Sequence, residues 1–256
     1  MTAKSTSNPD LGINILDVKI PPQLRENVKT NVTWIDDAFG GVGLTPSQTV
    51  LFTGTPGAGK TTTLLQVADG WTKGGGICLY NTCEEAIVQV RKVVERLDLK
   101  HGFVPGQNQK VPDVLTHCEY LRTQNPKKKI LLILDSLQVH DDGKYKDGGT
   151  NSMTPVRIAD MINDYCKTHF ACSIMIGQVT KSGKFAGKAA LQHHVDTHAH
   201  LHIDQRPSSE TLGKRIFKLE KNRFGSSGIA YVLDMNATKG LVVNDSFWVD
   251  DEESDA

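Results

Sequence analysis

The sequence contains few cysteines, and their spacing matches no metal or disulfide pattern. The five cysteines are scattered through the 256 residues and form no C-x-x-C pair. An odd number of unpatterned cysteines argues against a zinc ribbon and against a disulfide framework. We therefore expect a reducing environment, such as the cytoplasm.

Long apolar runs and an excess of charge of either sign are also absent. No apolar run approaches the roughly 20 residues that a helix needs to span a bilayer, and residues 1–10 are polar, without the apolar core of a signal peptide. We therefore expect no membrane contact. Lys plus Arg and Asp plus Glu both number 29, so the formal net charge is zero. A nucleic-acid site would have to be a local basic patch.

What the sequence does contain is an alternation of strand-like and helix-like segments. The run 130–134 is apolar at every position, which is typical of a strand buried on both faces of a parallel sheet. Residues 86–97 instead repeat apolar side chains at helical spacing. We predict an α/β fold, with a mostly parallel twisted sheet flanked by helices and antiparallel strands at its edge. The expected strands are 49–53, 77–80, 130–134, 173–179, 198–204, 215–220 and 229–234, and the expected helices are 61–73, 86–97, 111–122 and 156–168.

The chain length predicts one substantial core with flanking extensions. Residues 1–28 are a predicted N-terminal extension, because they begin with a Ser/Thr/Asn-rich stretch and contain two successive prolines, which favour extended backbone. Residues 29–244 form the predicted domain. Residues 245–256 form a predicted tail that ends in D-D-E-E-S-D-A, and this acidic segment is a candidate docking site for a protein partner.

A phosphate-binding motif follows the first expected strand and opens the first expected helix. Residues 54–61 fit G-x-x-x-x-G-K-T, the Walker A pattern or P-loop. Its glycines let backbone N–H groups turn toward phosphates, and the helix N-terminus adds partial positive charge. We expect Lys60 to contact the β- and γ-phosphates of ATP and the Thr61 hydroxyl to bind Mg²⁺. The candidate nucleotide contacts are Gly54, Thr55, Pro56, Gly57, Ala58, Gly59, Lys60, Thr61 and Thr62.

Carboxylates follow two of the expected strands, at the sheet edge where ligands of α/β folds bind. Asp135 ends the apolar run at 130–134 and is the candidate Walker B ligand of Mg²⁺, with strand capping as the alternative. Glu84 and Glu85 follow the strand 77–80 and are candidates for polarising the attacking water. Acidic residues near a helix N-terminus also have a plain dipole explanation, which accounts better for one glutamate than for two.

Several motifs together resemble the RadA/Sms branch of the RecA-like P-loop ATPases, over roughly residues 29–243. Besides the P-loop, they are F-G-G at 39–41, T-C-E-E-A at 82–86, L-D-S-L-Q at 134–138, G-Q-V-T-K-S-G-K-F-A-G at 177–187 and K-N-R-F-G at 221–225. The resemblance implies a RecA-like core that binds ATP between the subunits of a homo-oligomeric ring, expected to be a hexamer.

The resemblance also implies roles for single residues. Glu84 aligns with the catalytic glutamate, with Glu85 as the second candidate, and Gln178 resembles a sensor of the γ-phosphate. Lys221 and Arg223 are implied to reach the phosphates of a neighbouring subunit, where cations stabilise the charge that develops during transfer. A solvated strand edge is the alternative explanation for this pair, because residues i and i+2 of a strand share a face.

A basic loop follows the expected strand at 173–179. Residues 181–188 carry three lysines, four small residues and one aromatic ring. Lysines neutralise phosphates and aromatic rings stack on bases, so the loop suits single-stranded DNA, and it resembles the DNA-binding loop of the same family. A flexible basic surface loop is the alternative. The candidate DNA contacts are Lys181, Lys184, Phe185 and Lys188, and the Gly/Asp/Lys-rich loop 139–155 is a second candidate.

Two features depart from the family pattern. Full-length members carry an N-terminal zinc finger and a C-terminal Lon-protease-like domain, whereas no cysteine precedes Cys78 and no folded domain is expected after Phe247. The sequence therefore resembles the ATPase core alone, and a bacterial or phage-infected cytoplasm is the expected location. The second departure is a cluster of histidines: His193, His194, His198, His200 and His202.

The last three of these histidines alternate along one expected strand, in step with Asp196 and Asp204. Alternate residues share a strand face, so a shared metal ion is conceivable. We favour a polar strand face or a subunit contact instead, because ligands along one straight strand rarely close a tetrahedral shell.

These features predict an ATP- and Mg²⁺-dependent motor of recombination or repair that acts on single-stranded DNA, by branch migration or strand unwinding. One alternative is a replicative helicase motor of the DnaB type, which shares the core and the K-x-R pair. The other is a nucleotide-gated scaffold that binds proteins rather than DNA. Substitution of Lys184 and Lys188 distinguishes a motor from a scaffold.

Overall fold

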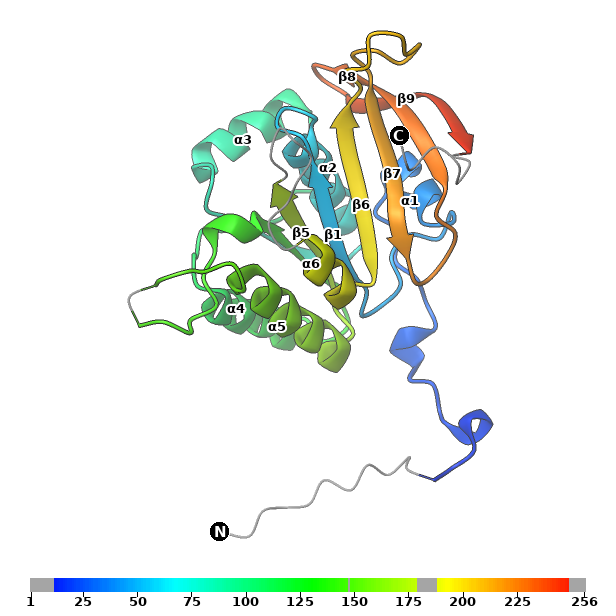
Figure 1. The fold of residues 1–256 in the computed structure, drawn as a ribbon. Coiled ribbons are helices and arrows are strands. Elements are labelled where there is room, and N and C mark those ends of the chain that lie inside the picture. The colour runs from blue at the N-terminus through cyan, green and yellow to red at the C-terminus, as the bar shows by residue number, and fades with distance from the viewer. Residues whose placement is uncertain (1–11, 147, 179–187, 249–256) are drawn as a thin grey trace.

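A nine-stranded β-sheet forms the centre of the protein (Figure 1). The computed structural model describes residues 12–146, 148–178 and 188–248. The strand order across the sheet is β3-β2-β4-β5-β1-β6-β7-β8-β9. The strands are β1 (Thr49–Gly54), β2 (Ile77–Thr82), β3 (Val104–Gly106), β4 (Ile130–Asp135), β5 (Cys172–Gln178), β6 (Thr197–Ile203), β7 (Arg215–Asn222), β8 (Ile229–Asn236) and β9 (Gly240–Trp248).

The first six strands are parallel, and the last three extend the sheet in antiparallel fashion. β1 lies between β5 and β6, while β2 lies between β3 and β4. Antiparallel pairing begins between β6 and β7 and continues to β9. The predicted α/β fold with a mostly parallel sheet and an antiparallel edge is confirmed. The sequence pattern had grouped β6 with the antiparallel strands, whereas it pairs parallel with β1.

Helices cover both faces of the parallel part, so its strands are buried on two sides. Leu131 and Ile133 of β4 belong to a hydrophobic cluster with α2 and α3, whereas Leu132 and Leu134 belong to a second cluster with α4 and α5. This double burial explains why the strand is apolar at every position. The helices are α1 (Thr33–Ala38), α2 (Lys60–Lys73), α3 (Ile87–Arg96), α4 (Val111–Gln124), α5 (Thr154–His169) and α6 (Lys188–His194).

The elements that the sequence pattern missed are short or polar. β3 has three residues and α1 has six, too few to show a period. β9 is exposed along most of its length, so it shows no continuous apolar alternation. α6 follows the basic loop directly and was included in neither an expected helix nor an expected strand.

The N-terminal segment of the described chain contributes little to the core. Residues 12–27 contain two 3₁₀ turns, Ile15–Asp17 and Pro22–Leu24, and neither has a buried residue. A β-bridge between Val28 and Leu44 then joins the chain to the body. The boundary at residue 28 agrees with this arrangement and stays a prediction. Within the part of the chain that the structure describes, no helix combines the length and apolar character needed to cross a membrane.

Candidate functional site

The P-loop connects the carboxyl end of β1 to α2. Gly57 and Gly59 have φ angles of +75° and +111°, and Gly59 is the residue before the first turn of α2. Such left-handed conformations are available to glycine at little cost. They place the loop backbone around the N-terminus of a helix, which is the arrangement that binds phosphate.

The Lys60 side chain folds back over this loop. Its Nζ donates to the carbonyl oxygens of Gly54 at 2.8 Å and Thr55 at 3.0 Å. Burial lowers the pKa of Lys60, although Asp135 and Glu84 oppose this effect. The ammonium group is therefore held over the phosphate-binding loop by two carbonyl groups that a bound anion would replace.

Neighbouring strands approach the P-loop closely, so that Gly54 is required on steric grounds, while Gly59 is required by its φ angle. A Cβ on Gly54 would lie 2.0 Å from the carbonyl oxygen of Leu201 in β6. A Cβ on Gly59 would lie 2.7 Å from Cε of Met235 in β8. The antiparallel end of the sheet thus contributes directly to the phosphate site, which the sequence motif did not reveal.

Asp135 lies at the carboxyl end of β4, opposite the start of α2. The Thr61 hydroxyl donates to its Oδ2 at 3.3 Å, and the Tyr80 hydroxyl donates to the same oxygen at 2.7 Å. Burial raises the pKa of Asp135 to about 6, with a further contribution from Glu84, while the hydroxyl donors partly offset the rise. A hydroxyl and a carboxylate side by side are hard oxygen donors of the kind that Mg²⁺ accepts. The predicted pair of metal ligands therefore fits the ion.

Glu84 is held by side chains from two other strand ends. Gln178 Nε2, at the end of β5, donates to Glu84 Oε1 at 2.7 Å and to Oε2 at 2.8 Å. The Ser136 hydroxyl, directly after β4, donates to Oε1. Glu85 also lines the cleft, but these bonds single out Glu84. The structure therefore brings the predicted catalytic glutamate and the predicted γ-phosphate sensor into direct contact.

These groups surround one cleft of about 360 Å³ at the carboxyl edge of the sheet. It contains Lys60, Thr61 and the carboxylates of both strand ends, and Ala58 lies buried beneath it. Sequence reasoning missed the contributions of Tyr80, Ser136, Ile176 and Met235, since none of them belongs to a phosphate motif. The residues that line the cleft are Pro56, Gly57, Gly59, Lys60, Thr61, Thr62, Glu84, Glu85, Asp135, Ile176, Gln178 and Met235.

Lys221 and Arg223 lie at the opposite ends of the strands from the P-loop, level with the start of β1. β7 ends beside Thr197, which is level with Val50, four residues before Gly54. Lys221 pairs with His198, which is level with Leu51, so the pair begins about 10 Å from Gly54, measured along the strands. The two cations therefore take no part in the cleft of their own subunit.

Intrachain partners hold both of these cations. Lys221 Nζ donates to the carbonyl oxygens of Gln192 at 2.6 Å and Val195 at 2.7 Å, at the end of α6. Arg223 Nη1 donates to Asp196 Oδ1 at 3.2 Å. Burial, followed by the neighbouring Arg223, lowers the pKa of Lys221. Lys221 is thus fixed by two carbonyl groups, whereas the Arg223 side chain is 51% exposed, and the role of the pair stays a prediction.

The candidate DNA-binding loop falls mostly outside the described residues. Lys181, Lys184 and Phe185 are not described, and Lys188 opens α6 without a described side chain. Their role stays a prediction. The strand before this loop and the helix after it are both placed, so the loop begins at the same sheet edge as the cleft.

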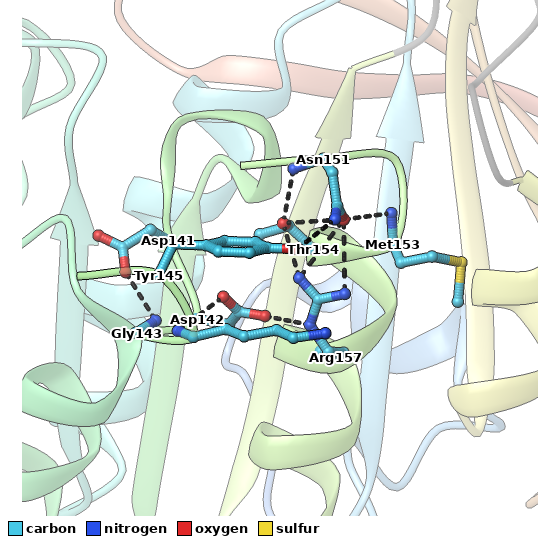
Figure 2. Close-up of polar contacts among 9 residues, drawn as sticks. Asp141, Asp142, Gly143, Tyr145, Asn151, Met153, Thr154 and Arg157 are labelled. Carbon is cyan, nitrogen blue, oxygen red and sulfur yellow. Dashed lines mark hydrogen bonds and ion pairs between the residues drawn. The ribbon is translucent and has the colours of Figure 1, made fainter. Parts of the chain in front are cut away.

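The second candidate loop, 139–155, is fixed by an ion pair at its base (Figure 2). Arg157 of α5 donates to the buried carboxylate of Asp142 and, at 3.0 Å, to the Thr154 hydroxyl. Asn151 donates to the Tyr145 hydroxyl at 2.9 Å across the loop. Burial raises the pKa of Asp142, but the bond from Arg157 and the other donors outweigh it and lower the pKa overall. The loop is thus supported from within the fold.

His194, His198 and His200 have protein partners, whereas Nδ1 of His202 is buried without a hydrogen-bond partner in the described part of the chain. His198 is fully buried and contacts the Thr53 hydroxyl at 2.7 Å through Nε2, and His200 contacts the same hydroxyl at 2.8 Å through Nδ1. His194, on α6, pairs with Asp160 of α5. Among the described residues, no group of histidine, cysteine or carboxylate side chains is arranged to hold a metal ion.

The sequence of the chain is similar to those of bacterial DNA repair proteins. No protein-family model matches the chain. It is 33% identical over 234 residues to "DNA repair protein RadA" of Aquifex aeolicus, covering 91% of this chain and 49% of that protein. It is 30% identical over 228 residues to the RadA protein of Mycobacterium tuberculosis, covering 86% and 45%. For the RadA protein of Haemophilus influenzae the identity is 33% over 193 residues, covering 75% and 39%. The chain thus spans about half the length or less of these curated relatives.

Solved structures show the same fold at lower sequence identity. The "ATPase Domain of G40P" superimposes with a TM-score of 0.71 at 14% identity, covering 84% of this chain and 90% of that one. A DnaB-like replicative helicase, solved in a study of its interactions with primase, gives 0.64 at 15% identity, covering 77% and 57%. The confirmed fold is therefore that of RecA-like helicase ATPase domains.

Proposed function

We propose that this chain, a homologue of the bacterial RadA proteins over most of its length, is an ATP-hydrolysing motor of DNA recombination or repair. Its nucleotide would bind with Mg²⁺ in the cleft at the carboxyl edge of the sheet. The observation that carries the proposal is the contact of Glu84 with Gln178 and Ser136 beside the P-loop. It joins three strand ends around the point where a γ-phosphate would lie.

Within the cleft, each side chain has a distinct task. Lys60 exchanges its two carbonyl partners for the β- and γ-phosphates, and the amides of the P-loop and α2 orient them. Thr61 and Asp135 would hold Mg²⁺, which neutralises phosphate charge when bound. Tyr80 fixes the Asp135 carboxylate by its hydroxyl group. Glu84 accepts a proton from the attacking water, and Gln178 holds its carboxylate in place.

The cleft has no cation from β7, so its charge stabilisation is incomplete within one subunit. Lys221 and Arg223 lie at the far edge of the sheet, where a second copy of the chain can present its own P-loop to them. We infer that the two cations stabilise the transition state of a neighbouring subunit in a ring, which we expect to be hexameric. ATP would then be bound at subunit interfaces.

The nucleic acid would be single-stranded DNA, held by loops that leave the same sheet edge as the cleft. Lys181, Lys184, Phe185 and Lys188 supply charge and one stacking ring, and the supported loop 139–155 adds a second contact. Branch migration or strand unwinding is the expected output. The acidic tail remains a candidate site for a protein partner.

The test is the ATPase rate with and without single-stranded DNA, together with binding of a labelled oligonucleotide at several salt concentrations. We expect stimulation by DNA, and we expect the double substitution Lys184→Ala/Lys188→Ala to weaken binding and flatten its salt dependence by about two counterions. Lys73→Ala/Lys92→Ala, on helices α2 and α3, is the matched control. If DNA neither binds nor stimulates hydrolysis, the motor is excluded and the nucleotide-gated scaffold is favoured.

A further inference from the structure

His198 occupies a junction between three segments that the proposed function uses separately. Thr53 of β1, which immediately precedes the P-loop, lies on one side of its ring. Gln192 of α6, the helix that follows the basic loop, lies on the other side with Glu220, which precedes Lys221 in β7. In the proposed function, β1 leads to the nucleotide-binding loop and α6 follows the DNA-binding loop. β7 carries Lys221, which would act on the nucleotide of a neighbouring subunit.

The contacts of the ring form a continuous hydrogen-bonded chain. His198 Nε2 lies 2.7 Å from the Thr53 hydroxyl, while Nδ1 lies 2.9 Å from Glu220 Oε2 and 2.8 Å from the Gln192 amide. A carboxylate can only accept, so Nδ1 carries the proton and Nε2 accepts the Thr53 hydroxyl proton. With this tautomer the donor pattern runs from Thr53 through the imidazole to Glu220, while Gln192 Nε2, itself a donor, packs beside Nδ1 without extending the pattern.

A bulge in β7 makes this contact possible. His198 pairs with Lys221 and Ala199 pairs with Leu219, so Glu220 is an extra residue between two successive pairs of the ladder. Bulges re-aim side chains beside functional sites. Here the Glu220 carboxylate reaches His198 while the adjacent Lys221 ammonium reaches the carbonyl groups at the end of α6. Two successive side chains of β7 thus hold one helix and one ring.

The geometry does not describe a second catalytic centre. Its order of hydroxyl, imidazole and carboxylate is that of a hydrolase triad. Thr53 and His198 are each 0% exposed, however, so no substrate reaches the hydroxyl group. A buried, fully partnered network instead fixes the relative positions of the elements that it joins.

The residues where β1 enters the P-loop are also connected to this network, through β6. The Thr55 amide donates to the Leu201 carbonyl oxygen at 3.2 Å, and the absent Cβ of Gly54 permits the close approach of β6. A displacement of α6 or β7 that is transmitted to His198 therefore also reaches β1 at its last residues. Packed elements of this kind transmit movement because they are close-packed rather than compliant.

We propose that His198 is a positioning residue that couples α6 and the K-x-R strand to the P-loop, so that DNA and nucleotide affect each other's affinity through it. This inference rests on the proposed function, because it assumes that the chain binds both ligands. Coupling is reciprocal, so either ligand reports it. His200 contacts the same Thr53 hydroxyl at 2.8 Å through Nδ1 and supports the network at that end.

The contacts from Thr53 through His198 to Glu220, called the His198 bridge below, can be broken at either end by a substitution of His198. The amide group of Asn is as many bonds from Cα as Nδ1 of histidine, and that of Gln is as many as Nε2. His198→Asn therefore keeps the contact with Glu220 and Gln192, and His198→Gln keeps the contact with Thr53. Thr53→Val removes the hydroxyl at nearly constant volume. His202→Gln, on the same strand face, is the matched control.

The experiment measures the affinity for a fluorescent ATP analogue with Mg²⁺, without and with saturating single-stranded DNA. We expect DNA to change this affinity at least about fivefold in the wild type and in His202→Gln. In His198→Asn, His198→Gln and Thr53→Val we expect the ratio to fall close to one, while each ligand alone binds as in the wild type. Loss of stability alone would weaken both separate affinities and leave the ratio intact.

The outcomes separate the two proposals. If both ligands bind the wild type but do not affect each other, or if the three variants keep the wild-type ratio, the bridge is refuted and the motor is not. If the oligonucleotide does not bind the wild type while the ATP analogue does, the proposed function fails and the bridge fails with it.

Discussion

At the scale of single residues, the carboxylates of the cleft depend on hydroxyl donors from three different segments of the chain. Tyr80 and Thr61 both donate to one oxygen of Asp135, and Ser136 donates to Glu84. Each donor fixes a carboxylate that must present a lone pair in a chosen direction. The carboxylates themselves could be predicted from strand-end positions, whereas their donors depend on which strands become neighbours.

Substitution of Tyr80 by Phe tests the role of these donors. It removes a 2.7 Å hydrogen bond to Asp135 and leaves the ring, which is buried, in place. We expect the ATPase rate at limiting Mg²⁺ to fall about tenfold, because partners that orient a metal ligand are worth that much. The measurement is a Mg²⁺ titration of steady-state turnover. Tyr120→Phe, on the exposed side of α4, is the control, and equal Mg²⁺ dependence of both variants would contradict the assignment.

The environment of Asp204, in the turn after β6, predicts that the stability of the protein depends on pH. The bonds from Arg206 hold its pKa well below the usual range, assisted by the hydroxyl groups of Ser209 and Thr211 and opposed by burial. Because the folded pKa is depressed, this stabilisation is present above the unfolded pKa of about 4 and is lost as pH falls below it.

We expect Asp204→Asn to lower the free energy of unfolding by about 2 kcal/mol at pH 7, the value of charge-assisted hydrogen bonds. The difference from the wild type should narrow as pH decreases below about 4. Urea denaturation of both proteins across pH 3 to 7 measures it. A difference that stays constant with pH would show that the carboxylate charge is not the cause.

At the scale of elements, the sequence pattern predicted the long buried strands well and the irregular segments poorly. The apolar run in β4 and the helical period of α3 are local signals, so they could be recognised without tertiary information. The partnership of His198 with Glu220 could not, since it depends on a bulge that shifts the register of β7 by one residue. Simple alternation had placed Lys221 and Arg223 on one strand face, and Arg223 in fact lies beyond the end of the strand.

The support of the loop 139–155 can be tested through Arg157, whose contacts Figure 2 shows. The Asp142 side chain is 2% exposed, so removing its partner leaves a buried charge without compensation. We expect Arg157→Gln to destabilise the protein by about 3 kcal/mol. Adding Asp142→Asn should recover much of this loss. Urea denaturation of the single and double variants gives the coupling free energy between Arg157 and Asp142.

The matched control is Arg91→Gln on α3. Arg91 pairs with Glu95 at 3.1 Å, but both side chains are more than 60% exposed. Such a surface pair contributes less than about 0.5 kcal/mol. Trypsin cleavage within the loop should increase in Arg157→Gln and stay unchanged in the control. Equal stability losses in the two variants would show that Asp142 does not require its partner.

At the scale of the whole molecule, the two groups of residues that the proposed function assigns to one ATP site lie at opposite ends of the strands. The P-loop, Glu84 and Asp135 lie at the carboxyl edge of the parallel strands, and the K-x-R pair lies at the other edge. The sequence motifs indicated both groups of residues. The sequence could not show that they lie at opposite ends of the strands, because that depends on the direction of β7. Under the proposed function, a complete site would combine the cleft of one chain with Lys221 and Arg223 of another.

Mixing of variants tests whether the two groups of residues combine between subunits. Arg223→Ala and Lys60→Ala should each be inactive, the first for lack of a trans cation and the second for lack of nucleotide binding. Mixed with an excess of Lys60→Ala, the Arg223→Ala protein should recover part of its ATPase rate, because its intact cleft meets an intact Arg223. Steady-state turnover of the mixture is the measurement.

The control mixture combines Lys60→Ala with Glu84→Gln, whose defects lie in the same cleft. It should recover no activity, since neither subunit has an intact cleft for hydrolysis. If this mixture recovers as much as the first one, the recovery reflects something other than exchange of Arg223. If neither recovers, the trans role of Arg223 is refuted.

The extra residue in β7 also limits how the gene for this protein can change. Substitutions between Leu219 and Arg223 alter one side chain at a time and leave the register of the strand as it is. Loss of the Glu220 codon would instead convert the bulge to a regular ladder and remove the carboxylate that now meets His198. A change of length here would therefore alter the carboxylate and the position of the K-x-R pair together, which no single substitution does.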